Sequence, residues 1–259
     1  MLNATQRRFA SVALVALVGV LVAAGGHDQA QALRQPLPSR LLWAWERPTD
    51  LSSLPPGVGV AYLAGTIRLS GNTLVSRPRL QLLAVPPLAT VVAVVRIESD
   101  TRRTVAPTPE LEDRTAHEVV ALCGRSPGIA GVQIDFDATV GDRPFYGPVL
   151  ARLRRLLPPA WSLSITALAS WCLGDPWIRD LPIDDAVPML FRMGRDAQGI
   201  RARIEAGQDF TLPVCRASLG VSLDEPLASM PASRRLYVFS PAGWNAANIA
   251  RATGRLGPE

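Results

Sequence analysis

The sequence predicts an α/β fold, a (β/α)8 barrel with a β-hairpin excursion after the second strand. Eight strand candidates occur along the chain, and helical patterns separate several of them. The chain has 259 residues, and α/β barrels commonly run about 200 to 250 residues as one domain. Hydrophobic residues make up 48% and charged residues 19% of the chain, which is a globular composition with an apolar lean. The number of strand candidates decides the architecture more than any one segment does.

The first strand is predicted over residues 41–46, where the sequence LLWAWE is largely apolar. It ends before Pro48, because proline has no N–H to donate to a sheet ladder. Residues 49–56 are predicted to form a short turn or helix that Asp50 caps. A second strand is expected over residues 59–64.

Residues 66–76 are predicted to form a β-hairpin, because the pattern alternates on both sides of a Ser-Gly-Asn turn. The β-branched run TVVAVVRIE at residues 90–98 is the clearest third strand. A helix over residues 110–123 follows, with Pro109 at its start and Gly124 at its end.

The rest of the chain alternates strands and helices. The remaining strands are expected at residues 131–137, 161–168, 187–192, 216–221 and 236–240. The remaining helices are expected at residues 146–157, 195–206 and 246–256, with Asn245 as the N-cap of the last one. This alternation is typical of a TIM-like barrel.

The N-terminus has the pattern of a Sec-type signal peptide. Arg7 and Arg8 precede an apolar run at residues 9–24, and the small-x-small site Ala-Gln-Ala follows at residues 30–32. Cleavage there removes residues 1–32 and leaves one domain over residues 33–259. The alternative is an uncleaved anchor, although the run is shorter than the roughly 20 residues of a spanning helix. Periplasmic or secreted localisation is expected, with membrane contact only through this segment if it stays attached.

The composition argues against several classes of function. All 27 basic side chains are arginine and are scattered along the chain, and the net charge is only +5, so no nucleic-acid partner is expected. No cofactor is expected either, because the chain has neither a G-x-G-x-x-G motif nor a P-loop. His117 is the single histidine after the signal segment, which argues against a Ser-His-Asp triad and a histidine metal cluster.

Three cysteines, at positions 123, 172 and 215, are too few and too widely spaced for a disulfide scaffold or a zinc site. Each is expected to be a small buried hydrophobic residue. The alternative is that one pair forms a disulfide in an oxidising compartment and leaves one thiol over.

The strand at residues 131–137 combines an apolar face with an acidic one. Because strand side chains alternate, one face holds Val132, Ile134 and Phe136 and the other holds Gln133, Asp135 and Asp137. Burying an ionised carboxylate without partners is costly, and active sites of α/β barrels lie at the carboxyl ends of the strands. The strand therefore predicts a catalytic pair, Asp135 and Asp137. The alternative is an internal polar network that only orders the barrel, and two carboxylates on one strand are a weak signal for a metal.

Five segments, LLWAWERP, GVAYLAGTIRLSG, GVQIDFDA, LSITALASWC and LPIDDAVPMLFRMG, resemble a bacterial family catalogued as domain of unknown function 3142. The resemblance spans most of the chain after the signal segment. It indicates a family and implies no activity.

A more distant likeness is to the chitinase-like glycoside hydrolases of family 18, whose fourth strand reads D-G-x-D-x-D-x-E with the last Glu as general acid. On residues 130–137 the chain keeps Gly131 and Asp135, departs at Ala130 and Gln133, and has Asp137 in place of the Glu. The resemblance implies a TIM barrel that acts on carbohydrate, with Asp137 as the acid.

Two further family positions look similar. The M-x-Y-D of the sixth strand resembles residues 189–192, with Phe191 for the tyrosine and Arg192 for the aspartate, and Trp244 is placed like the tryptophan after strand eight. Substrate-assisted cleavage uses both lost polar groups. A two-carboxylate mechanism is therefore at least as plausible an expectation for this chain.

In that mechanism Asp137 is the general acid and Asp135 is its tuning partner, because a like charge close by disfavours ionisation. The second catalytic carboxylate is expected at another strand end, at Glu46 or Glu98, although either is also typical of a solvated or salt-bridged loop acid.

Other polar and aromatic residues are expected to bind the substrate. Arg96 and Arg192 are predicted to pair with acids of the site or with an anionic sugar, and Gln133 shares the polar face of its strand. Trp171 and Trp244 follow strand ends, where they either stack on sugar rings or pack loops. Trp43 and Trp45 are expected to be core residues more than binding platforms.

The sequence thus predicts an exported carbohydrate-active barrel whose partner is an oligosaccharide or polysaccharide, with glycoside hydrolysis as the expected reaction class. The alternative is a non-catalytic glycan-binding or cell-envelope scaffold protein, which the missing glutamate favours.

Overall fold

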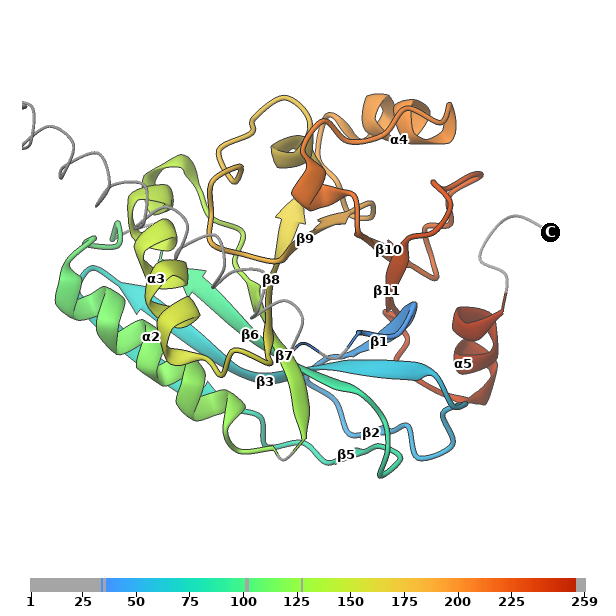
Figure 1. Cartoon of the computed structure of the whole chain (residues 1–259), viewed down its shortest axis with the longest axis horizontal. Coiled ribbons are helices and arrows are strands. Elements are labelled where there is room, and N and C mark those ends of the chain that lie inside the picture. The colour runs from blue at the N-terminus through green and yellow to red at the C-terminus, as the bar shows by residue number, and fades with distance from the viewer. Residues whose placement is uncertain (1–33, 35, 101–102, 127, 255–259) are drawn as a thin grey trace, which may run out of the picture.

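The computed structural model describes residue 34 and residues 36–100, 103–126 and 128–254. Eight parallel strands form a closed barrel (Figure 1) in the order β1-β11-β10-β9-β8-β7-β6-β3, which closes through pairing of β1 with β3. The strands are β1 (Arg40–Ala44), β3 (Val58–Ser70), β6 (Val91–Ser99), β7 (Ile129–Asp135), β8 (Ser162–Leu168), β9 (Asp185–Met189), β10 (Ser218–Ser222) and β11 (Arg235–Phe239). The predicted (β/α)8-type barrel is confirmed.

Helices cover the barrel unevenly. They are α2 (Pro109–Cys123), α3 (Arg143–Leu156), α4 (Ala197–Glu205) and α5 (Ala246–Thr253), with 3-10 turns η1 (Val140–Asp142), η2 (Ala169–Cys172) and η3 (Pro213–Cys215). Figure 1 shows α2 and α3 side by side on one flank, α5 on the opposite flank and α4 beyond the ends of β9 and β10. Within the described residues, several strands are therefore joined by loops where a regular barrel has helices.

Two predicted helix starts are confirmed. Helix α2 begins at Pro109, and the Thr108 hydroxyl accepts a hydrogen bond from the N–H of Leu111 at 3.3 Å. Helix α5 follows Asn245, whose side chain accepts from the N–H of Asn248 at 2.9 Å. Both caps satisfy N–H groups that the first helical turn leaves without a partner.

The hairpin is also confirmed, but its first arm is longer than predicted. Strand β3 runs on without a break through residues 58–70, with a register irregularity between Leu63 and Gly65, and pairs antiparallel with β4 (Thr73–Pro78). Gly71 in the turn has a φ of 58°, which glycine adopts without strain. The predicted second strand and the hairpin are therefore one element.

The segment after the first strand differs from the prediction. In place of a turn or helix over residues 49–56, β2 (Thr49–Asp50) pairs in parallel with β5 (Leu83–Ala84), and a turn follows it. The Asp50 carboxylate still acts as a local acceptor, from the N–H of Ser52 at 2.9 Å. A pairing between two-residue strands about thirty residues apart leaves no pattern in a sequence window.

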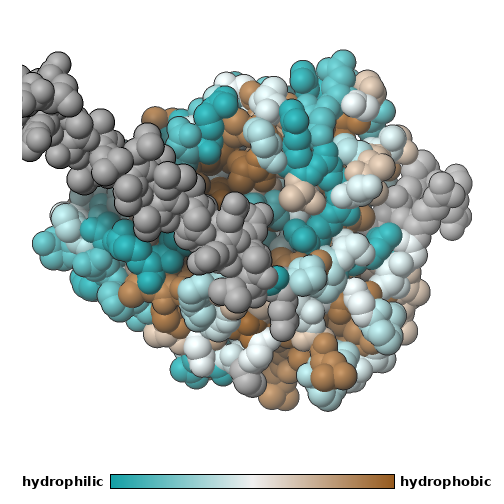
Figure 2. Space-filling view, in the orientation of Figure 1, coloured by the Kyte–Doolittle hydropathy of each residue, from teal (hydrophilic) through white to brown (hydrophobic). Residues whose placement is uncertain are grey.

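The loops that flank β5 leave apolar side chains exposed. Leu80, Leu82 and Leu88 are 78%, 83% and 98% exposed, and Figure 2 shows apolar residues gathered at the edge where β2 and β5 lie in Figure 1. Among the described helices, none lies over this edge in Figure 1.

Strand alternation separates two apolar layers. Val132, Ile134 and Phe136 pack outward into the large cluster that the helices cover. A smaller cluster fills the inside of the barrel and includes Trp43 and Tyr237. The other face of β7, with Gln133 and Asp135, therefore points into the barrel, as the period-two pattern predicts.

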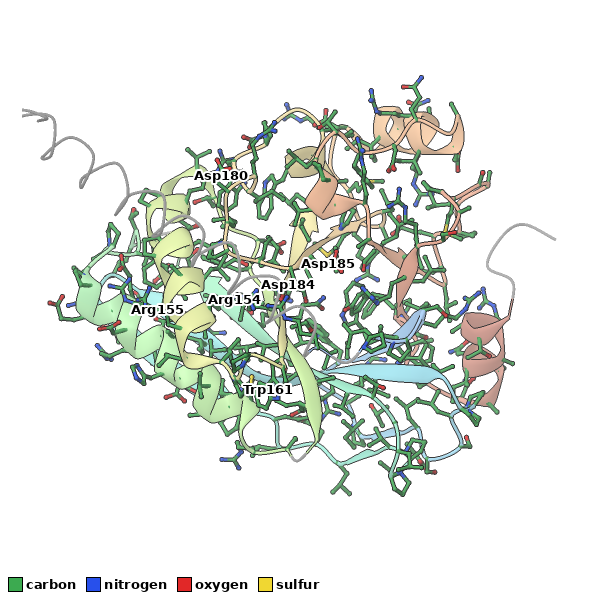
Figure 3. All side chains as sticks on the ribbon, viewed as in Figure 1. Arg154, Arg155, Trp161, Asp180, Asp184 and Asp185 are labelled. Atoms are coloured by element: carbon green, nitrogen blue, oxygen red, sulfur yellow. A yellow bond between two sulfur atoms is a disulfide. The ribbon has the colours of Figure 1, made fainter. Side chains whose placement is uncertain are left out.

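An internal polar network lies at the amino-terminal end of β9. The Ser218 hydroxyl donates to Asp185, and Arg235 lies 3.4 Å from the same carboxylate oxygen. Next to it, Asp184 pairs with Arg154 of α3 at 2.9 Å (Figure 3). Burial raises the pKa of Asp185 to about 6. The polar network expected as an alternative role for the strand acids has a counterpart here among other residues, and Asp135 itself accepts a hydrogen bond from Thr166 and lies near Arg96.

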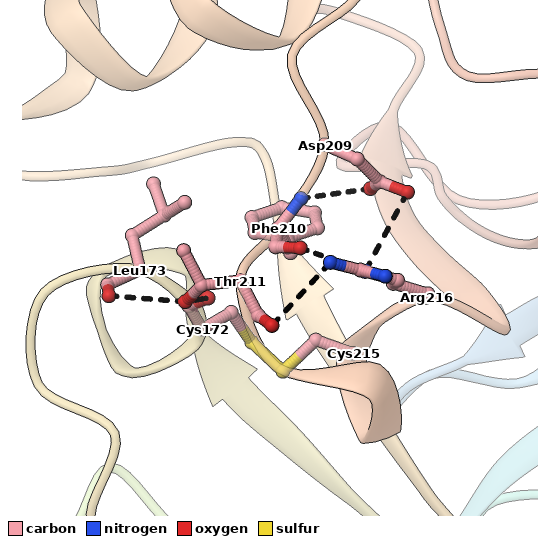
Figure 4. The surroundings of a disulfide bond; sticks show 7 residues. All are labelled: Cys172, Leu173, Asp209, Phe210, Thr211, Cys215 and Arg216. Carbon is pink, nitrogen blue, oxygen red and sulfur yellow. Dashed lines mark hydrogen bonds and ion pairs between the residues drawn. A yellow bond between two sulfur atoms is a disulfide. The ribbon is translucent and has the colours of Figure 1, made fainter.

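A disulfide joins Cys172 in η2 to Cys215 in η3 (Figure 4). The two cysteines are separated by 43 residues in sequence, yet η2 follows β8 and η3 precedes β10, so both lie next to β9. Thr211 also bonds to the Cys172 carbonyl through its hydroxyl at 2.9 Å. Cys123 is a free, buried thiol. The expectation of three unbridged cysteines is therefore wrong for one pair.

In the portion of the chain described, no helix combines the length and the apolar character needed to cross a membrane. The expected signal segment, residues 1–32, lies outside the described residues.

The disulfide is expected to stabilise the fold measurably. Closing a loop of 43 residues reduces the entropy of the unfolded chain, with an expected contribution of about 2 to 4 kcal/mol to the free energy of unfolding. Thermal unfolding with and without a reductant measures this difference. The matched control is the variant Cys123→Ala, which should lose as much stability on reduction as the wild type does. An unchanged melting temperature of the wild type in reductant would contradict the expectation.

Candidate functional site

A pocket of about 640 Å³ opens at the carboxyl ends of the barrel strands. Six strands each contribute a side chain to its wall: Trp43, Arg96, Asp135, Thr166, Met189 and Phe239. This is the end at which α/β barrels place their active sites. We refer to it as the main pocket.

Asp135 is a buried acid in the wall of the main pocket. Its side chain accepts a hydrogen bond from the Thr166 hydroxyl at 2.7 Å, and Arg96 lies 3.6 Å from its other oxygen. Burial raises the pKa of Asp135 to about 6, the contacts with Thr166 and Arg96 lower it, and the charges of Asp137 and Glu98 raise it again. Asp135 therefore exchanges its proton in mildly acidic solution.

Asp137 lies two residues further along, just beyond the end of β7, and its side chain is exposed. It lines both the main pocket and an adjoining pocket of about 520 Å³. The pair thus consists of one buried carboxyl and one exposed carboxyl at the mouth. Asp135, expected only to tune its neighbour, is the member whose pKa burial raises.

Gln133 lies inside the barrel and does not line the pocket. Its amide oxygen accepts from the Trp43 indole N–H at 2.8 Å, and its amide nitrogen donates to the Ser164 hydroxyl at 3.4 Å. The prediction that Gln133 binds substrate is corrected, because its polar atoms are used to connect strands within the closed barrel.

The two arginines predicted for the site both line the main pocket. Arg96 pairs with Glu98 at 3.1 Å and lies 5.9 Å from the centre of the Trp45 ring. Arg192 lies over the Phe239 ring at 5.4 Å. Both positions suit contact with an occupant of the pocket.

Neither glutamate predicted as the second catalytic carboxylate lines the main pocket. Glu46 forms an ion pair with Arg77 of the hairpin, with oxygen–nitrogen distances of 2.8 and 3.0 Å. Glu98 pairs with Arg68 at 3.0 Å and with Arg96, and lines only the adjoining pocket. Both are salt-bridged acids, which was the alternative role expected for them.

Trp171 and Trp244 have different surroundings. Trp171 is 3% exposed and packs edge-on against Trp177 with ring centres 5.0 Å apart, so it belongs to the core and not to the pocket. Trp244 is half-buried and donates its indole N–H to the Trp43 carbonyl at 2.8 Å. It borders a smaller recess of about 200 Å³, which Trp45 also lines.

An aromatic wall completes the main pocket. Phe191 and Phe239 stack with ring centres 5.6 Å apart and an angle of 11° between the rings, and Trp43 lies 6.1 Å from Phe191. Half-buried Trp45 continues this wall at the mouth. Trp43 and Trp45 were expected to be core residues. Trp43 is buried in the inner cluster and Trp45 packs against that cluster, and both residues also line the pocket. Trp43 and Trp45 are two residues apart, so strand alternation directs both to the same side, which at Trp43 is the inside of the barrel. This alternation is the signal that could have identified them.

The described residues contain no cluster of three His, Cys, Asp or Glu side chains that is suited to hold a metal ion.

No family model matches the chain, so its resemblance to domain of unknown function 3142 is not supported by that comparison. No curated protein matches it in sequence. Among solved structures, it is similar to the apo form of an endo-beta-N-acetylglucosaminidase from Cordyceps militaris, with 12% identity and a TM-score of 0.41 over 84% of this chain and 85% of the other. A similarity of this size carries no argument about activity, and the function is argued from the pocket.

The buried carboxyl of Asp135 is expected to make the stability of the fold depend on pH. Its pKa rises from 3.8 to about 6 on folding, so the folded state binds more protons between these values. The contribution of this carboxyl to the free energy of unfolding is therefore fully present below about pH 4 and is lost as the pH rises through about 6. Asp135→Asn should lack this pH dependence. Its free energy of unfolding, relative to that of the wild type, should rise by about 1 to 3 kcal/mol as the pH increases from about 4 to about 7.5.

Denaturant unfolding at a series of pH values measures the difference. The pKa of Asp185 is also raised to about 6, so the free energy of unfolding of Asp135→Asn should still decrease with pH. The double variant with Asp185→Asn should show a smaller decrease. If the free energies of unfolding of the wild type and of Asp135→Asn change in parallel with pH, the pKa of the Asp135 carboxyl is not raised in the folded state.

Proposed function

We propose that the protein is a carbohydrate-active barrel that binds an oligosaccharide in the main pocket and hydrolyses a glycosidic bond there. The observation that carries this proposal is the pairing of buried Asp135, with its pKa of about 6, with exposed Asp137 in an aromatic-lined pocket at the catalytic end of the barrel. Two carboxyl groups in different environments are the usual acid and base of glycoside hydrolysis.

The aromatic wall supplies the binding surface. Sugar rings have apolar C–H faces that pack on aromatic rings, and Phe191, Phe239 and Trp45 present such rings to the pocket. Polar groups at the same wall, among them Thr166 and Arg96, are placed to contact hydroxyl groups of the sugar. A pocket of about 640 Å³ is large enough for a few sugar units.

Asp137 is the proposed general acid. It is the member of the pair that reaches solvent and an occupant of the pocket, and it lies where the two adjoining pockets meet. Its proton goes to the glycosidic oxygen as the bond to the leaving sugar breaks. Asp135 is held in the wall of the same pocket by Thr166 and Arg96.

A water molecule or a carboxylate must attack the other side of the sugar carbon. Glu46 and Glu98 do not line the main pocket, but Asp196 does, at the start of α4. We assign the second carboxylate role to Asp196, because it is the remaining acid in the wall of that pocket among the described residues.

A non-catalytic glycan-binding or envelope scaffold is the second candidate. It is favoured by the ion pairs of the strand-end acids, since Arg96 contacts both Asp135 and Glu98, and Arg77 contacts Glu46. In this alternative the pocket binds a sugar and the paired acids only order its wall.

Export to the periplasm or the exterior is part of the proposal. The disulfide between Cys172 and Cys215 supports it, because disulfides form and persist in oxidising compartments. The expected signal segment at residues 1–32 has the same implication.

The variant Asp137→Asn should separate catalysis from binding. Loss of the general acid is expected to lower the hydrolysis rate by about 10² to 10⁴-fold, while oligosaccharide affinity stays within about threefold because the aromatic wall is intact. Release of reducing ends measures cleavage, and calorimetric titration measures binding, across a panel of neutral and acidic oligosaccharides.

Asp180→Asn is the matched control, because Asp180 is exposed and lies outside the main pocket (Figure 3). It should cleave like the wild type. Full activity in Asp137→Asn would remove Asp137 from the mechanism. Binding without cleavage by the wild type over the whole panel would establish the scaffold alternative, and absence of both would end the carbohydrate assignment.

A further inference from the structure

The main pocket is rich in guanidinium groups. Four arginines line it: Arg47, Arg96, Arg192 and Arg195. The acids in the same wall are Asp135, Asp137 and Asp196. With all seven groups ionised, the wall therefore carries four positive and three negative charges. The ion pairs of the four arginines show which of them are free to bind an anionic ligand.

Arg96 is already neutralised. It lies 3.6 Å from Asp135 and 3.1 Å from Glu98, so two carboxylates share its charge. The other three arginines are different. Arg47 donates to the Pro241 carbonyl at 2.9 Å, and within the described residues neither Arg47 nor Arg195 forms an ion pair. Their charges face solvent at the pocket mouth.

Arg192 has only a distant carboxylate partner. Asp224 lies 3.8 Å away, beyond hydrogen-bonding distance, and the Arg192 side chain is 57% exposed. Its guanidinium instead lies over the Phe239 ring at 5.4 Å. Arg192 is thus a cation on the aromatic wall with most of its donors unused by protein acids.

The backbone holds Arg192 in place. Its φ is 50°, a left-handed conformation that is strained for a residue other than glycine. The Glu225 carboxylate accepts a hydrogen bond from its N–H at 3.1 Å. Such local strain persists where the surrounding structure enforces it, and it is common at ligand-binding sites. The strained turn directs the side chain toward the aromatic wall.

We infer that the occupant of the main pocket is an acidic oligosaccharide, in which a carboxylate on a sugar ring pairs with Arg192 and Arg195. The ring itself packs on the wall formed by Phe191 and Phe239. This inference rests on the proposed function and names the substrate class of the same site.

A carboxylate fits these residues better than a neutral sugar does. A guanidinium group offers parallel N–H donors that match the two oxygens of a carboxylate. A neutral sugar that covers Arg192 would remove water from its charge without supplying an anion, which is unfavourable. The acids Asp135 and Asp137 come from β7 and its end, whereas Arg192 and Arg195 come from the loop between β9 and α4. The negative sugar group is thus recognised by a different segment from the one that carries the proposed acid.

Calorimetric titration with matched probes tests the inference. The probes are tetrasaccharides of galacturonate, of alginate and of hyaluronan, each compared with its methyl ester, which keeps the ring and removes the charge. At least one acid form should bind the wild type about tenfold more tightly than its ester. The double variant Arg192→Gln Arg195→Gln should bind the acid form and the ester form with equal affinity.

Arg155→Gln is the matched control, because Arg155 is an exposed arginine of α3 outside the pocket (Figure 3). It should keep the preference for the acid form. The single variant Arg195→Gln, which changes an exposed side chain without an ion pair among the described residues, should lose part of the preference and guards against misfolding of the double variant.

Equal binding of acid and ester by the wild type would overturn the inference and leave the proposed function standing. Tighter binding of a sulfated heparin tetrasaccharide than of every carboxylate probe would overturn the carboxylate assignment. Absence of binding to every oligosaccharide would overturn both this inference and the proposed function.

Discussion

Closure of the barrel between β1 and β3 is the constraint on which the rest of the structure depends. Once the sheet closes, every second side chain of each strand points into the barrel, where a buried polar atom without a hydrogen-bond partner is costly. Gln133 meets this requirement by bonding to Trp43, which β1 brings across the barrel. Asp135, two residues further along, lies at the top of the same face, where Thr166 and Arg96 contact it and burial raises its pKa. The character of the site is therefore a product of closure, and residues far from the pocket in sequence contribute to it.

The sequence predicted the regular elements well because each has a local physical cause. Alternation marks the strands, and Pro109 and Asn245 mark helix starts through backbone groups that lie within a few residues. The failures concern partners that are distant in sequence. The pairing of β2 with β5 and the bond between Cys172 and Cys215 depend on which strands become neighbours, and a single sequence does not contain that order. The unbroken run of β3 shows the same limit, since its irregularity at Gly65 looks like an end when its partners are unknown.

At the site, the strand face on which a residue lies predicted its location better than its nearness to a strand end in the sequence. Asp135 lines the pocket because its position on the inner face of the strand fixes its direction, and Arg96 and Arg192 line the same pocket. Trp171 instead packs into the core. Strand alternation could not predict this, because Trp171 lies in a turn after the strand. Glu46 illustrates a competing interaction, since the hairpin brings Arg77 close enough to pair with it. The aromatic wall was underestimated because tryptophan is equally typical of cores and of binding surfaces, and Trp43 here belongs to both. Strand alternation therefore predicts acids at strand ends more readily than it predicts the aromatic surface on which a ligand would bind.

The bridge between Cys172 and Cys215 turns the segment between them into a covalent ring that contains β9, α4 and the loop with Arg192. A protease that cuts within this ring produces two polypeptides that stay attached, so the nicked molecule keeps its mass until a reductant separates them. The loop that carries Arg192 therefore stays attached to the rest of the molecule after a single cut, for as long as the bridge is intact.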